Sequence, residues 1–252
     1  MLREENEEKY SIKFLDWDTN FFGINSAKIY LYDEFCNDDI KKIKKIVKEK
    51  KYEFITIQNC RNIEKNNVLI SNFKGAFLVD VNIQFEKKLD RSKEIENKKN
   101  VHIKEIYEKD ENIIDIAKKA FTESRFLIDS KLRRGNEVYV QWVNNSFGKQ
   151  NKFFCIYRED KKTKGFILFS IEKDKKSIFL ELIAVDKDSK HKGIGTILIK
   201  KLENFAIQNK IEYIHVGTQL NNLSAQNFYE KNGFKHIMNN SIYHWWINKT
   251  NS

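Results

Sequence analysis

The chain of 252 residues contains no proline, only nine glycines and only three cysteines. Lysine, asparagine and isoleucine are abundant, so we interpret the missing proline as a genome-wide compositional bias rather than a functional signal. Cys36, Cys60 and Cys155 are odd in number, lie far apart and form no C-x-x-C pair. This pattern argues against a disulfide framework and a zinc site, and we expect no metal.

Long apolar runs are also missing. No stretch reaches the length that a membrane-spanning helix needs, and the segment from Met1 to Tyr10 is charged, unlike a secretory signal. Hydrophobic residues make up 40% of the chain and aromatic residues 13%, which is typical of a globular protein. We therefore expect a soluble, cytoplasmic protein of one large domain or two modest ones, without membrane insertion.

The net charge of +10 would suit an anionic partner. Lysine and arginine are spread along the whole chain, however, and are mixed with acidic residues in every region. No nucleic-acid recognition motif accompanies them, so we expect no nucleic-acid partner. Most of the charge is interpreted as solvated surface, with selection of an anionic ligand as the alternative.

Hydrophobic periodicity predicts alternating strands and helices, and hence an α/β class. The polar stretch 86–100 is typical of a linker, with an exposed helix as the alternative, and predicts domains over 1–95 and 101–252. The expected strands are 11–17, 27–31, 52–57, 76–85, 101–106, 153–157, 165–172, 177–185 and 211–218. The expected helices are 38–50, 62–73 and 113–121, and 158–164 is expected to be a hairpin turn.

The segment from Leu180 to Gln208 carries a pattern with chemical meaning. A strand ends at Val185, a polar loop follows, and Gly193 and Gly195 stand where an amphipathic helix begins. The first N–H groups of a helix lack internal partners and lie at its positive end, and glycine lets an anion approach them closely. Phosphate or pyrophosphate binding is one interpretation, and an ordinary strand–helix turn is the other. The Walker pattern is absent, and the dinucleotide pattern fails because Leu198 occupies its third glycine position.

A second motif follows the next expected strand. Asn222, Ala225, Phe228, Tyr229 and the pair Gly233-Phe234 form the pattern N-x-x-A-x-x-F-Y-x-x-x-G-F. Together with the loop Lys190-His191-Lys192-Gly193-Ile194-Gly195, this order resembles the GNAT superfamily of N-acetyltransferases. Lys190 departs from the family's usual Gln or Arg. The resemblance spans residues 101–252 and implies the GNAT fold with its mixed sheet there, while the narrower resemblance described below implies a smaller, shortened GNAT-like N-terminal domain beside it.

The resemblance implies acetyl-CoA as acyl donor. Its pyrophosphate would lie on the backbone of the loop, and its pantetheine arm along the strand that ends at Val185. A backbone N–H near Ile183 would polarise the thioester carbonyl. The implied cofactor-binding residues are Ile183, Ala184, Val185, Lys190, His191, Lys192, Gly193, Ile194, Gly195, Thr196 and Asn222, with a helix cap as the alternative for Asn222.

Two residues are candidate catalytic groups. Tyr229 matches the family's tyrosine, and a phenol of ordinary pKa near 10 can protonate the leaving thiolate. The alternative is a tyrosine that only packs on its helix. Glu181 lies on the strand before the loop and is a candidate base, acting through water, with a structural carboxylate as the alternative.

A narrower resemblance covers more of the chain. The segments Leu15–Ile29, Ala120–Phe126 and Tyr139–Trp142 are similar to dTDP-fucosamine acetyltransferases. This resemblance implies a nucleotide-linked amino sugar as the small-molecule acceptor, attacked directly, and allows a homodimer. It also suggests that Arg125 contacts a nucleotide phosphate, with a surface ion pair as the alternative. The open alternatives for function are a protein, polyamine or other small amine as acceptor, and a non-catalytic acyl-CoA-binding module.

Overall fold

The computed structural model describes residues 9–90, 100–122, 124–172, 176–189 and 192–247, which form two compact units. Unit 1 contains the residues up to Ile83, the short segment 131–133 and the residues from Met238 onward. Unit 2 contains Gln84–Ser130 and Arg134–Ile237. Strands β4 (Ala76–Lys88) and β10 (Lys235–Trp246) contribute residues to both units, so the units do not follow the division into 1–95 and 101–252. That residues 1–95 fold as a separate domain stays a prediction.

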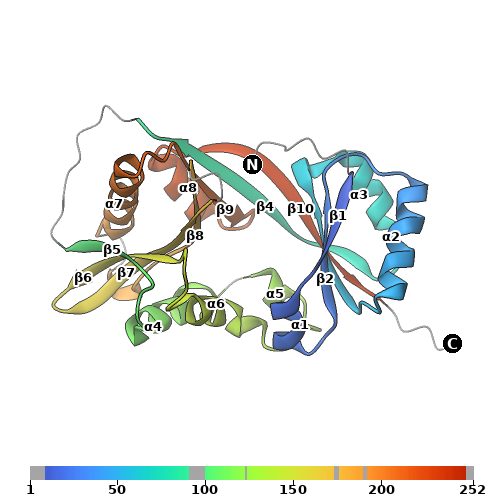
Figure 1. Ribbon diagram of the computed structural model, residues 1–252, viewed down its shortest axis with the longest axis horizontal. Coiled ribbons are helices and arrows are strands. Elements are labelled where there is room, and N and C mark those ends of the chain that lie inside the picture. Colours follow the sequence, from blue (N-terminus) through green and yellow to red (C-terminus); the bar gives the residue numbers. More distant parts are fainter. Residues whose placement is uncertain (1–8, 91–99, 123, 173–175, 190–191, 248–252) are drawn as a thin grey trace. The chain divides into compact units, whose positions relative to one another are not determined.

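Unit 1 is a mixed sheet with helices α2 (Asn37–Glu49) and α3 (Glu64–Ser71) on one face (Figure 1). Its strand order is β1-β2-β3-β10-β4, with β2 and β3 parallel and the pairs β1–β2 and β3–β10 antiparallel. The remaining elements are β1 (Tyr10–Phe14), α1 (Asp16–Phe22), β2 (Ser26–Leu31), β3 (Phe54–Asn59) and η1 (Cys60–Asn62).

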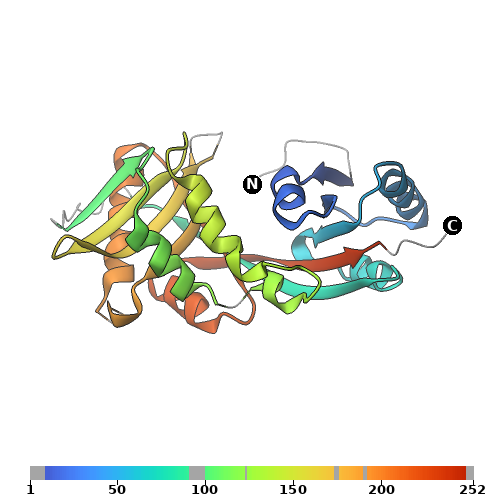
Figure 2. The same cartoon turned by 90° about the horizontal axis from the view of Figure 1, so that it is seen from below.

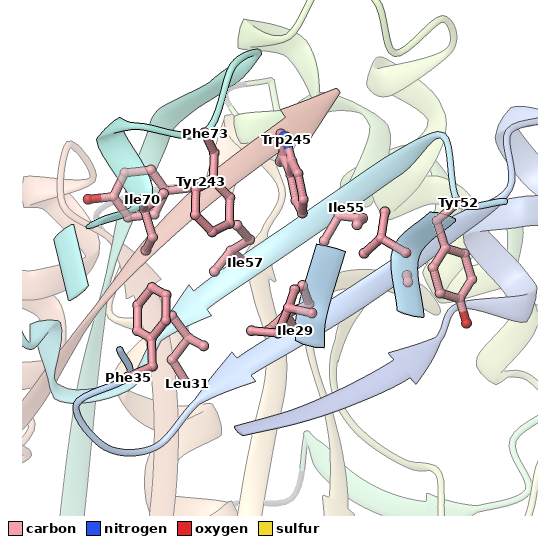
Figure 3. Packing of buried hydrophobic residues seen from close by; sticks show 13 residues of the cluster. Ile29, Leu31, Phe35, Tyr52, Ile55, Ile57, Ile70, Phe73, Tyr243 and Trp245 are labelled. Atoms are coloured by element: carbon pink, nitrogen blue, oxygen red, sulfur yellow. The ribbon is translucent and has the colours of Figure 1, made fainter. Parts of the chain in front are cut away.

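The core of unit 1 lies between the sheet and helices α2 and α3. Alternate side chains of β2 and β3, such as Ile29 and Ile57, point to the same layer of apolar residues (Figure 3). Phe73 packs against Trp245 of β10, with the ring centroids 4.8 Å apart. The alternate apolar residues of the strands and the apolar face of α2 therefore pack in one core, as the sequence pattern predicts.

The first expected strand was predicted too long. It ends at Phe14, and Asp16 and Trp17 begin helix α1. Acidic side chains in the first turn favour a helix because they face its positive end. Gly23, at φ 68°, ends the helix in the left-handed region and donates its N–H to the carbonyl of Thr19.

Unit 2 has the strand order β4-β9-β8-β7-β6-β5, antiparallel from β5 to β8 and parallel between β8 and β9. Helices α4 and α6 cover one face of this sheet and α7 covers the other (Figures 1 and 2). The elements are β5 (Val101–Glu105), α4 (Glu111–Ala120), α5 (Arg125–Ile128), η2 (Gly135–Glu137), α6 (Val138–Ser146), β6 (Phe153–Glu159), β7 (Lys162–Ile171), β8 (Ser177–Val185), η3 (Lys187–Ser189), α7 (Ile194–Gln208), β9 (Tyr213–Gln219) and α8 (Leu223–Lys231). The predicted mixed α/β class is confirmed.

Two connections differ from the sequence prediction. The hairpin turn is shorter than 158–164, because only Asp160 and Lys161 leave the strands, both with positive φ of 49° and 63°. Two left-handed residues suit the right-handed twist of the flanking strands. The expected linker over 86–100 starts later, since β4 continues to Lys88, and residues 91–99 lie outside the described part. In the ranges that the structure describes, no helix is both long and apolar enough to cross a membrane.

Asp110 ties the start of α4 to the hairpin β6–β7. Its carboxylate accepts hydrogen bonds from the N–H of Asn112 (2.9 Å), the hydroxyl of Thr163 (3.0 Å) and the guanidinium of Arg158 (3.3 Å). Burial opposes ionisation, but these hydrogen bonds outweigh it and lower the pKa of Asp110 below its usual value.

We expect Asp110→Ala to lower the free energy of unfolding by about 1–2 kcal/mol at pH 7, because it removes a helix cap and its partners. Because the pKa of Asp110 is lower in the folded state than in the unfolded state, its ionised form stabilises the fold at pH values above the usual aspartate pKa of about 3.9. This stabilisation is lost as the pH falls through the folded-state pKa. The difference in unfolding free energy between wild type and Asp110→Ala, measured from urea unfolding curves, should therefore shrink below about pH 4. A difference that stays constant from pH 7 to pH 2 would contradict this role.

Candidate functional site

Strand β8 leaves its parallel neighbour halfway along its length. It pairs with β7 from Ile178 to Val185, but with β9 only from Ser177 to Leu180. Glu181 is a bulge residue, since Leu180 and Leu182 lie opposite consecutive residues of β7. Beyond Leu180, no described residue of β9 pairs with β8. Backbone groups alternate between the two edges of a strand, so part of 181–185 presents N–H and C=O groups to this unpaired edge.

Helix α7 begins close to the end of this strand in the chain. Gly193 precedes Ile194 at φ 76°, and no side chain of the described residues caps the helix. The first turn holds no acidic residue, and Lys192 is exposed beside it. A Cβ atom built on Gly193 would meet no described atom within 4 Å. The start of α7 therefore has the N–H groups and the dipole that favour an anion.

The two sequence motifs meet in space at Gly195. A Cβ atom on this residue would lie 2.9 Å from Cε2 of the Phe228 ring on α8. Glycine at this position leaves room for the Phe228 ring against the first turn of α7. The structure thus brings together the predicted residues Gly193, Ile194, Gly195 and Thr196 with the second motif. Lys190 and His191 lie outside the described residues.

Asn222 occupies the N-cap of α8. Its side-chain oxygen accepts the N–H of Ala225 at 3.0 Å. This is the helix cap that the sequence left open as an alternative, and it occupies the oxygen that would otherwise face a ligand. A contact of Asn222 with the acyl donor stays a prediction.

Tyr229 lies on α8 with only 4% of its surface exposed. Its ring is surrounded by the rings of Phe85, Phe228 and Phe234, with centroids 5.6–5.7 Å away. Burial raises the pKa of the Tyr229 hydroxyl far above its usual value. A phenol of ordinary pKa is also protonated at neutral pH, so this shift does not distinguish a proton donor from a tyrosine that only packs. Packing and proton donation are compatible at this position, and the catalytic role stays a prediction.

Glu181 is held on both carboxylate oxygens. Oε2 accepts the indole N–H of Trp142 at 3.0 Å, and Oε1 pairs with the ammonium of Lys152. The side chain is only 4% exposed. The sequence patterns included Trp142 only as part of the segment Tyr139–Trp142 and did not identify Lys152, because only the fold brings α6, the residue before β6 and β8 together. The predicted role of Glu181 as a base is not tested by these contacts.

Arg125 is the first residue of the short helix α5. Its guanidinium carbon lies 4.4 Å from the ring centroid of Phe126. The expected contact with a nucleotide phosphate stays a prediction. In the described ranges, no group of three or more histidine, cysteine, aspartate or glutamate side chains is arranged to hold a metal ion.

Unit 1 repeats the order strand, helix, parallel strand in β2, α2 and β3. These described elements lack the two features of unit 2, the unpaired strand edge and the helix start without acidic residues. β2 and β3 stay paired from Ser26 to Leu31, so no edge opens between them. The first turn of α2 carries Asp38 and Asp39. The Asp39 carboxylate accepts the N–H of Cys36 at 2.9 Å, which lowers its pKa and keeps it charged. A negative charge at this helix start would repel an anion, so the site features belong to unit 2.

Comparison with known proteins agrees with this assignment. Residues 111–234, which include α4 to α8, match the family described as "Acetyltransferase (GNAT) family". A curated relative is the spore coat polysaccharide biosynthesis protein SpsD of Bacillus subtilis, 29% identical over 141 residues. That match covers 55% of this chain and 48% of the relative. The chain therefore spans about half the length of the curated relatives it matches.

Solved structures share the fold at low sequence identity. A conserved protein of unknown function from Staphylococcus epidermidis has a TM-score of 0.66 and 15% identity, with 98% of this chain and 94% of that chain covered. A GCN5-related N-acetyltransferase from Sphaerobacter thermophilus has a TM-score of 0.61 and 10% identity, with 94% and 76% covered. At sequence identities of 10–15%, structural similarity shows a shared fold and not a shared function.

Proposed function

We propose that the chain, whose residues 111–234 match the GNAT acetyltransferase family, transfers an acetyl group from acetyl-CoA to the amine of a nucleotide-linked amino sugar. The family uses acetyl-CoA as acyl donor. The observation that carries the proposal is the unpaired edge of β8 beyond Leu180, together with the uncapped start of α7 at Gly193. These two features occur in unit 2 and are missing from the equivalent elements of unit 1.

Both features fit the donor. The pyrophosphate of acetyl-CoA would bind the N–H groups from Gly193 to Thr196, with Lys192 adding positive charge. The amides of the pantetheine arm would pair with the edge formed by Ile183, Ala184 and Val185, as an added strand does. Lys190 and His191 stay predicted members of the same loop.

The reaction needs a nucleophile, a proton acceptor and a proton donor. The amine nitrogen attacks the thioester carbonyl, a C–N bond forms and the C–S bond breaks. The amine proton passes to water or to Glu181 acting through water, and Tyr229 gives its proton to the departing sulfur. Tyr229 regains a proton from solvent, so the products are the amide and CoA with a free thiol.

The choice of acceptor rests on two observations. The relative SpsD is named for polysaccharide biosynthesis, which supports a sugar acceptor. The chain also has a second unit that lacks the donor-site features, and a single acetyltransferase domain would not need it. Arg125 is the predicted contact for a phosphate of the nucleotide.

The proposal is tested by measuring thiol release from acetyl-CoA with a panel of amines. Turnover with dTDP-linked amino sugars, and little turnover with peptides or polyamines, is the expected result. Preference for a peptide or polyamine would contradict the sugar acceptor while keeping the acetyltransferase. Binding of acetyl-CoA without turnover of any amine would contradict the enzyme and favour an acyl-CoA-binding module.

A further inference from the structure

Trp142 stands apart from the other aromatic residues of unit 2 because it is large, exposed and held in one orientation. It is 36% exposed, and its indole N–H donates to Glu181 at 3.0 Å. Its ring stacks on Tyr139, with the planes 8° apart and the centroids 6.2 Å apart. Tyr139 in turn stacks on Phe121, with centroids 4.9 Å apart. An exposed tryptophan with a fixed ring is a low-entropy contact surface for a ligand.

The partner that fixes this ring is itself at the proposed reaction centre. Glu181 is the bulge residue at which β8 leaves β9. Its side chain is buried, and the ammonium of Lys152 binds the oxygen that Trp142 does not use. The buried charge of Glu181 is therefore paired. Lys152 fixes the Glu181 carboxylate, which in turn holds the Trp142 indole next to the strand edge that would bind the donor.

We propose that the exposed part of the Trp142 indole is the surface on which the ring of the acceptor sugar packs, and that Glu181 and Lys152 position it. This inference rests on the proposed function. The acceptor amine must reach the thioester at the edge of β8. A pyranose ring bonded directly to that amine then lies beside the residue that Glu181 holds. The nucleobase is separated from the amine by the sugar and two phosphates, so it lies further away.

Pyranose rings suit such a surface because one face carries mainly C–H groups, while the hydroxyl groups point outward. A flat aromatic ring covers the C–H face and leaves the hydroxyl groups in water or on polar partners. Trp142 would then select ring-bearing amines over acyclic amines. Glu181 would then be a positioning residue, with its carboxylate engaged by Trp142 and Lys152, and of the two proton acceptors named above water would take the amine proton.

The test compares Trp142→Leu and Trp142→Phe in steady-state assays with a dTDP-linked amino sugar. We expect the leucine variant to raise the KM for the sugar by roughly tenfold, equivalent to the loss of one good aromatic contact. The phenylalanine variant keeps a flat ring and should show a smaller rise. The KM for acetyl-CoA should stay unchanged in both, because the donor edge and the start of α7 are untouched.

Tyr157→Leu is the matched control. Tyr157 is half-buried on β6, two residues from Cys155, whose thiol contacts the Leu198 carbonyl of α7. By strand alternation it lies on the face of the sheet opposite α6. It should leave the KM for the sugar unchanged. An equal effect of the Tyr157 and Trp142 variants would overturn the proposal.

Calorimetric titration of the dTDP-linked amino sugar separates this inference from the proposed function. Weaker binding to Trp142→Leu than to wild type supports the sugar surface even if neither protein turns the sugar over. Equal binding and equal KM in wild type and Trp142→Leu overturns the sugar surface even if the wild type is a good acetyltransferase.

Glu181→Gln adds a second readout. A positioning role predicts a raised KM for the sugar with an unchanged pH dependence of kcat. A general base predicts loss of the acidic limb of the kcat–pH profile.

Discussion

Replacing Tyr229 by phenylalanine should lower kcat by about a hundredfold or more, which is the usual contribution of a general acid. The variant keeps the ring that packs against Phe85, Phe228 and Phe234, so the melting temperature should change little. It removes only the hydroxyl, whose pKa is raised by burial. Thiol release at saturating acetyl-CoA and amine measures the effect. A kcat within threefold of wild type would assign Tyr229 to packing alone.

Tyr243→Phe is the matched control for this prediction. Tyr243 is also a buried tyrosine, but it lies on β10 in unit 1 and donates its hydroxyl to Asn67 at 2.8 Å. Removing that hydroxyl should cost about 1 kcal/mol of stability, the typical value of a buried hydrogen bond, and leave kcat unchanged. The two tyrosines should therefore show opposite effects on stability and on rate.

Replacing Gly195 by alanine should weaken acetyl-CoA binding at least tenfold and destabilise the fold by roughly 1–3 kcal/mol. The added Cβ atom would lie 2.9 Å from the Phe228 ring, closer than packed carbon atoms approach. The Phe228 ring, α8 or the first turn of α7 must move, and a movement of α7 displaces the N–H groups that would bind pyrophosphate. Thermal unfolding and calorimetric titration with acetyl-CoA measure the two effects.

A double-mutant cycle identifies the cause. Phe228→Leu removes the ring atoms that the new Cβ meets, so Gly195→Ala should cost at least 1 kcal/mol less in that background. Gly193→Ala is the control, because its Cβ would meet nothing within 4 Å and only its φ of 76° is strained. Its cost should be about 1–2 kcal/mol in both backgrounds. Equal coupling of both glycines to Phe228 would contradict the packing explanation.

Local patterns predicted most elements of the fold. Helix α2 and the strands β2, β3, β7 and β8 follow from hydrophobic periodicity that their own residues carry. Strand β10 was not predicted, because its polar centre, with Asn239 and Asn240, resembles a turn. In the structure Asn240 is buried, and its side chain accepts the N–H of Arg61, 179 residues away in the chain. No local pattern contains that partner.

The helix start and the strand that we propose for the donor were predictable from the sequence, and the partners of Glu181 were not. Gly193, Gly195 and the second motif lie within one continuous stretch, where spacing alone places them on a helix start and a following helix. Glu181 depends on a bulge and on partners from two other elements, Trp142 and Lys152. Such partners are chosen by sheet register and helix packing, which sequence periodicity does not specify.

The most direct measurement is hydrogen exchange of the backbone amides, followed by mass spectrometry, with and without acetyl-CoA. Donor binding at the edge of β8 and the start of α7 should slow exchange in residues 177–189 and 192–205. It should leave residues 26–45 unchanged, because the equivalent strand edge in unit 1 is paired and the start of α2 is acidic. Slower exchange in 26–45, or unchanged exchange in 177–189 and 192–205 while calorimetry detects bound acetyl-CoA, would contradict a donor site in unit 2.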